Sequence, residues 1–132
     1  MHRVEKIKES TATRILVLKN EVTGTRDECF DDSALVSDQN FDFMQVNQSY
    51  PCKIKLFGKQ VSAKEARVVT CRVLNENSRI GNTDFVEVSV GEDVYYVLKS
   101  QVMNRSEKSS FIFKVSRKDL IQVNQTIHKD LY

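Results

Sequence analysis

The stretch FVEVSVGEDVYYVL, residues 85–98, decides the fold class of this chain. In residues 85–90 every second residue is a valine with polar neighbours, which is the two-residue period of a half-buried strand. A second apolar run, VYYVL at 94–98, follows after the three-residue, glycine-containing turn at 91–93. A gap of this kind between two such runs is typical of a β-hairpin. The stretch therefore predicts two antiparallel strands joined by a tight turn, and one of two adjacent tyrosines must point outward.

The same alternation recurs on both sides of this hairpin. In CKIKLFG, residues 52–58, the apolar side chains face one side and Lys53 and Lys55 face the other, and the glycine ends the predicted strand. The runs ILVL at 15–18 and FIFKV at 111–115 predict two further strands.

One segment is open to both helix and strand. Residues 62–65, SAKE, form a helix-capping pattern, but the residues that follow are mostly β-branched. Because β-branched side chains favour strands, we expect a short turn at 62–65 and a strand over 66–75.

The C-terminal part favours a helix. Residues 116–119, SRKD, resemble a capping pattern, and Leu120, Val123, Ile127 and Leu131 follow at helical spacing. The pattern predicts a C-terminal helix.

These elements add up to a mainly β protein. Six or seven short strands with one substantial helix indicate a small closed barrel, since closure removes exposed strand edges. The chain has 132 residues, one proline and four glycines, so no flexible linker divides it. We expect a single domain over residues 1–132.

Two segments resemble known barrel families. Residues 46–58, VNQSYPCKIKLFG, resemble the entry into the first strand of OB-fold domains. Residues 86–102, VEVSVGEDVYYVLKSQV, resemble the later strands of an SH3-like barrel: a tight hairpin, a tyrosine-bearing strand and a short Lys-Ser-Gln-Val turn. The OB pattern expects an element between its third and fourth strands, and the tight hairpin departs from it. The resemblance implies an OB/SH3-like architecture, which hosts many binding functions.

Cysteine usage and hydropathy indicate the compartment. The three cysteines are an odd number without CxxC spacing, so neither a disulfide framework nor a zinc site is expected. No stretch has the length or apolarity of a signal peptide or a membrane span. We therefore expect a cytoplasmic protein that uses no cofactor and does not associate with membranes.

Residues 23–40 predict a long loop that carries an acidic cluster. Its four carboxylates, Asp27, Glu28, Asp31 and Asp32, could dock on a basic protein partner. Carboxylates are also ligands for Mg²⁺ and Ca²⁺, so a metal-dependent enzyme is a further alternative. The spacing of an EF-hand is absent, and we assign no metal site.

A basic set lies in the middle of the chain, where residues 50–80 hold seven lysines and arginines against two glutamates. Single-strand nucleic-acid binders combine such cations with aromatic rings on which bases stack. The candidate nucleic-acid-binding residues are Lys53, Lys55, Lys59, Arg67, Arg72, Tyr50 and Tyr96.

Catalytic motifs are missing from the sequence. His2 and His128 lie near the chain ends, where a catalytic geometry is hard to hold, and no GxSxG, HExxH or GxxxxGK[ST] pattern occurs. We expect a non-enzymatic interaction module whose partner is either a protein or single-stranded nucleic acid. The nucleic-acid alternative requires residues 52–59, 64–72 and 99–118 to converge on one face.

Overall fold

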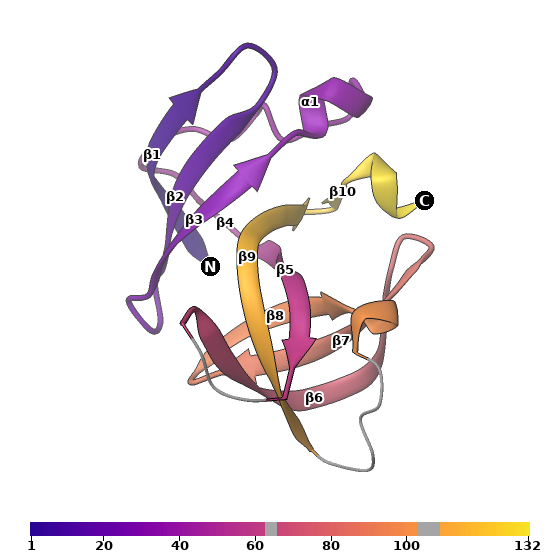
Figure 1. The fold of residues 1–132 in the computed structure, drawn as a ribbon. Helices are drawn as coiled ribbons and strands as arrows, with labels where there is room; N and C mark the ends of the chain where they lie inside the picture. The colour runs from indigo at the N-terminus through magenta and orange to yellow at the C-terminus, as the bar shows by residue number, and fades with distance from the viewer. Residues whose placement is uncertain (63–65, 103–108) are drawn as a thin grey trace.

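The computed structural model describes residues 1–62, 66–102 and 109–132, in which β-strands predominate (Figure 1). The strands are β1 (His2–Glu9), β2 (Arg14–Asn20), β3 (Arg26–Asp31), β4 (Ser49–Tyr50), β5 (Cys52–Val61), β6 (Val68–Ile80), β7 (Thr83–Val90), β8 (Asp93–Leu98), β9 (Ser110–Val123) and β10 (Thr126–Ile127). The helical segments are the single-turn α1 (Ser33–Val36) and the 3-10 turns η1 (Lys99–Gln101) and η2 (Lys129–Leu131). None of the helices in the described ranges is long and apolar enough to cross a membrane.

Strands β5 to β9 close a five-stranded barrel, which confirms the prediction of a mainly β protein with a small barrel. The predicted six or seven short strands are wrong in number, since five further strands lie outside the barrel. Around the barrel the order is β9-β5-β8-β7-β6, and β6 pairs with β9 to complete the circle. All of these pairings are antiparallel except β5 with β8, which is parallel. Closure leaves no free sheet edge inside the barrel itself.

The other strands extend this sheet. Strands β4, β1, β2 and β3 form an N-terminal sheet, which joins β9 through the parallel pair of Phe30 and Asp119. Strand β9 is long enough to serve both parts, and Figure 1 shows it running from the barrel up to the N-terminal sheet. One buried cluster contains Leu16 and Phe41 from the N-terminal part together with Leu56 and Phe113 from the barrel.

The predicted hairpin at 85–98 is confirmed as β7 and β8, and η1 follows it at the predicted Lys-Ser-Gln-Val turn. A strand in place of a helix at 66–75 is also confirmed, although β6 begins at Val68 and runs on to Ile80. The turn expected at 62–65 falls largely outside the described residues. Gly58 does not end its strand, because β5 continues through it to Val61.

The predicted C-terminal helix is wrong. Residues 116–123 belong to β9, and the chain ends in β10 and the short turn η2. The register between β5 and β9 shifts between Lys53 and Ile54, so that Ile121 is an extra residue on β9. Because of this bulge, Leu120 and Val123 both face the core although they are three residues apart. The bulge thus reproduces the spacing of a helix inside a strand.

The long loop predicted over 23–40 is also wrong in its first half. Residues 26–31 form β3, which pairs antiparallel with β2 from Arg14 to Lys19. In β3 the acids alternate with a buried cysteine, so no apolar run marks it as a strand.

Candidate nucleic-acid interface

The basic segments of the sequence converge in space, because β9 lies between β5 and β6. Lys59 of β5 pairs directly with Lys114 of β9, and Lys114 pairs on its other side with Val68 of β6. Residues directly opposite each other in paired strands carry their side chains on the same face. Residues 55–59 of the first segment, 68–72 of the second and 110–117 of the third therefore meet on one outer surface of the barrel.

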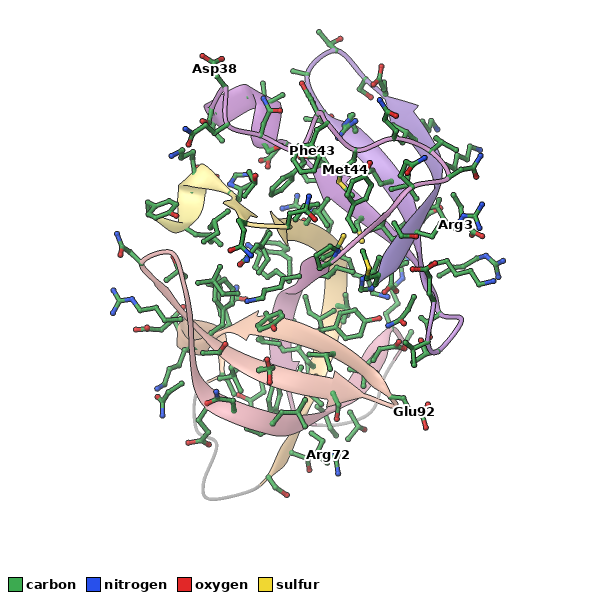
Figure 2. The ribbon with its side chains drawn as sticks, turned by 180° about the vertical axis from the view of Figure 1, so that it is seen from behind. Arg3, Asp38, Phe43, Met44, Arg72 and Glu92 are labelled. Atoms are coloured by element: carbon green, nitrogen blue, oxygen red, sulfur yellow. The ribbon has the colours of Figure 1, made fainter. Side chains whose placement is uncertain are left out.

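We call this surface the basic wall: the outward side of residues 55–61, 68–72 and 110–119. Its inward neighbours include Cys71 and Phe113, which are fully buried, whereas Arg72 and Lys59 are exposed. Asp119 is the only acid in these three described segments. The cations of the wall are Lys55, Lys59, Arg72, Lys114 and Arg117. Figure 2 shows Arg72 at the end of the barrel farthest from the N-terminal sheet, on which Arg3 lies.

Arg67 adjoins the wall at the start of β6. It is exposed, and its carbonyl accepts a hydrogen bond of 3.2 Å from the Val115 N–H of β9. Four of the five sequence-predicted cations are thus on the wall or beside it.

An exposed aromatic ring lies within the wall. Phe57 is 38% exposed, and the Arg117 guanidinium carbon lies 4.9 Å from its ring centre. The same guanidinium lies 4.6 Å from the Phe30 ring and donates two hydrogen bonds to the Asp119 carboxylate. These bonds raise the pKa of Arg117. Lys55 also pairs with Asp119, at 3.6 Å, so this one acid faces two cations and neutralises them only in part.

Three sequence-predicted residues lie elsewhere. Tyr50 is on β4, where its hydroxyl accepts the Gln45 N–H and its ring packs edge-on against Phe43. Lys53 and Tyr96 lie together at the far end of β5, with the Lys53 ammonium 5.6 Å from the Tyr96 ring centre.

The two adjacent tyrosines point to opposite sides of β8, as expected, but both are buried. Tyr95 faces the main core, and its hydroxyl donates to Asp27. Tyr96 faces outward but belongs to a second buried cluster that includes Ile121 and Leu131. The C-terminal segment, residues 126–132, covers the ring, which sequence alternation alone does not reveal.

The four acids of the predicted docking loop do not form one surface patch. The Asp27 carboxylate is buried and accepts from Tyr95 and Lys118, and the Asp31 carboxylate is buried against Arg14. Glu28 is exposed and Asp32 is half-buried. Two of the four carboxylates are therefore already neutralised inside the protein.

Asp32, His128 and Asp130 form the one group in the described residues with the spacing of metal ligands. His128 does not lie in a free chain end, because its side chain is buried and its Nε2 lies 2.6 Å from the Asp32 carboxylate. Its Nδ1 accepts the Asp130 N–H at 3.1 Å, which places the ring proton on Nε2. A metal at Nε2 would have to displace that proton and break both hydrogen bonds. The arrangement fits a structural link between α1 and the C-terminal segment better than a metal centre.

The cysteines are unsuited to nucleophilic chemistry at neutral pH. All three are free, and Cys29 and Cys71 are buried. Burial raises the pKa of Cys52 and of Cys71 to about 12, and it raises the pKa of Cys29 well above its ordinary value. The reactive thiolate is therefore scarce.

No protein-family model, curated protein or solved structure matches this chain. A function for the basic wall must therefore be inferred from its geometry and charge.

Proposed function

We propose that this chain is a non-enzymatic binding module that binds single-stranded nucleic acid through the basic wall. The observation that carries the proposal is the convergence of β5, β9 and β6, which places five cations and an exposed aromatic ring on one surface, with Asp119 as the only acid among its described residues. Cations beside an aromatic ring are the combination that single-strand binders use.

The wall offers a path for an extended strand. From Ser110 to Arg117 it runs along eight residues of β9, which are seven steps of roughly 3.3 Å or about 23 Å in all. Along this path Arg72, Lys114 and Lys59 would contact phosphates, and a base would stack on the open part of Phe57. Because none of these contacts reads a base edge, the binding would depend little on sequence.

The barrel type supports a binding role by analogy. Its tight β7–β8 hairpin and the η1 turn favour the SH3-like resemblance over the OB one, and we propose that the barrel belongs to this small-barrel class. Docking of a basic protein through the acidic residues is the weaker alternative, since Asp27 and Asp31 are committed to internal ion pairs.

The first prediction concerns charge on the wall. The double variant Lys59→Gln/Lys114→Gln should bind a labelled oligothymidylate more weakly than the wild type, because two phosphate contacts are lost. Each contact with a single strand contributes about −0.7 to the slope of log affinity against log salt, so the slope should become shallower by about 1.4. Fluorescence anisotropy across a salt series measures both quantities.

The matched control removes two exposed lysines from another face. Lys6 and Lys8 lie on β1, which β2 and β3 separate from β9. Lys6→Gln/Lys8→Gln should leave the slope unchanged. Undetectable binding of the wild type at low salt, or equal losses in the two double variants, would rule out the wall as the binding surface.

The second prediction concerns stacking on Phe57. Phe57→Ala should weaken oligothymidylate binding by about 5- to 150-fold, since a base stacked on an aromatic ring contributes about 1–3 kcal/mol. The salt slope should not change, because no cation is removed. Phe43→Ala is the control, since Phe43 is similarly exposed (41%) but belongs to the N-terminal part. A change in salt slope without loss of affinity would show that Phe57 only positions Arg117.

A further inference from the structure

Apart from the basic wall, the protein has a recess at the start of β5, beside Cys52 and Lys53. It is a groove of about 470 Å³ between the β7–β8 turn, the β9–β10 turn and the N-terminal sheet. Its size falls in the range of roughly 300–1,000 Å³ that is typical of small-ligand sites. The lining residues that matter here are Lys53, Glu92, Tyr96, Gln122, Asn124 and Gln125. Figure 2 shows Glu92 at the tip of the β7–β8 hairpin, and this residue lines the groove.

The groove is separate from the basic wall, although Lys53 and Lys55 both face outward from β5. Ile121, Leu131 and Tyr96 belong to one buried cluster; the first two line the recess beside Lys55, and Tyr96 lines the groove beside Lys53. The two recesses share no lining residue. Lys53 therefore lines the groove, whereas Lys55 lies beside Asp119 and Arg117.

Lys53 is a half-buried cation without a carboxylate partner in the described part of the chain. Two other half-buried lysines do have such partners: Lys55 pairs with Asp119 and Lys118 with Asp27. The Lys53 ammonium instead lies beside the Tyr96 ring. An unpaired cation at the wall of a recess favours an anionic ligand group, because partial burial strengthens the attraction.

The opposite rim carries amides with unused hydrogen-bonding capacity. The Gln122 amide nitrogen donates to the Asn124 carbonyl at 3.1 Å, which leaves its own side-chain oxygen free to accept. Among the described residues, the side chains of Asn124 and Gln125 form no hydrogen bond. Amides of this type pair with the edges of bases, and a carboxylate such as Glu92 accepts from an exocyclic amino group. The Tyr96 ring and Val94 supply an apolar floor.

We propose that this groove binds one nucleotide, with its phosphate on Lys53 and its base between the amides and Glu92. The nucleotide is either free or the end of a nucleic-acid strand. The site stands independently of strand binding by the basic wall.

Titration calorimetry with adenosine 5′-monophosphate and cytidine 5′-monophosphate tests the site. We expect Lys53→Gln to weaken binding about tenfold or more, as for loss of a charge-assisted hydrogen bond, and Lys53→Arg to retain most of the affinity. Gln125→Ala should change the ratio of the two affinities, because Gln125 contacts the base. Lys59→Gln/Lys114→Gln should leave both affinities unchanged, since those lysines lie on the basic wall.

Several results would overturn the proposal: no binding of either nucleotide, equal affinity for inorganic phosphate, or equal affinity for adenosine and its monophosphate. A wild-type affinity retained in a folded Lys53→Gln variant, checked by thermal melting, would do so as well. If nucleotides bind but oligothymidylate does not, the nucleotide site in the groove is supported and the proposed strand binding by the basic wall is ruled out. Comparing oligonucleotides with a 5′-phosphate and a 5′-hydroxyl identifies the source: tighter binding of the phosphorylated strand assigns the groove to a strand end, and equal binding assigns it to free nucleotides.

Discussion

Replacing Arg14 by methionine should destabilise the fold by about 3–5 kcal/mol, the usual cost of removing one partner from a buried ion pair. The Arg14 guanidinium donates two hydrogen bonds to the Asp31 carboxylate, at 3.0 and 3.2 Å, and a third to the Phe41 carbonyl at 2.6 Å. Both charged side chains are nearly inaccessible, with 10% and 2% of their surface exposed. In the variant, the Asp31 charge would stay buried with only the Ser33 N–H and hydroxyl as donors. Urea unfolding measures the loss as a lower midpoint.

The matched control is Arg26→Met, which breaks the Arg26–Glu5 pair on the outer side of the same sheet. That pair is as short as 2.6 Å, but the arginine side chain is 59% exposed. Solvent screens such a pair, so the urea midpoint of the control should fall far less than that of Arg14→Met. Arg14→Met/Asp31→Asn should recover part of the loss, since the neutral amide still accepts from Ser33. Equal effects of Arg14→Met and Arg26→Met would show that burial does not set the strength of the inner pair.

The parts of the fold that sequence predicts are those where local periodicity and turn chemistry agree. The hairpin at 85–98 is an example, because its valines face one side and a glycine at a φ of 60° forms the turn. The alternation at 111–115 likewise predicts a strand, and this segment is part of the longer β9.

Other features depend on contacts between distant residues and leave no local pattern. The bulge at Ile121 gives Leu120 and Val123 helical spacing, and only the pairing with β5 identifies the segment as a strand. The burial of Asp31 is invisible in an acidic stretch, because its partner Arg14 is 17 residues away.

The candidate site also combines features that follow from the local sequence pattern with features that depend on contacts between distant residues. Alternation alone indicated that Lys53 and Lys55 share the outward side of β5. It could not show that Lys114 would lie between Lys59 and Val68, since that needs the barrel to close through β9. Nor could it show that residues 126–132 would cover Tyr96 while the Phe57 ring stays exposed beside the cations of β5 and β9.

Replacing Gly58 by alanine should destabilise the protein by more than about 4 kcal/mol, an exceptional effect for one methyl group. A Cβ at this position would overlap the Lys114 carbonyl oxygen and would lie 3.1 Å from the Phe113 ring. The first contact is with backbone, so no side-chain rotation can relieve it, and β5 and β9 would have to separate. Gly58 also lies at the register shift between Phe57 and Gly58, which sets Phe57 opposite Arg117 and Lys59 opposite Lys114.

Gly24→Ala distinguishes this steric cost from the ordinary cost of losing a glycine. A Cβ on Gly24 would meet nothing within 4 Å, but its φ of 79° is unfavourable for alanine and should cost about 1–2 kcal/mol. Thermal unfolding of both variants separates the two effects. If Gly58→Ala remains folded at low temperature, it should also bind oligothymidylate more weakly than Gly24→Ala does, because a shifted β5 would move Phe57 and Lys59 away from their partners on β9. A folded Gly58→Ala protein with the stability and affinity of Gly24→Ala would mean that the close approach of β5 and β9 does not hold the basic wall together.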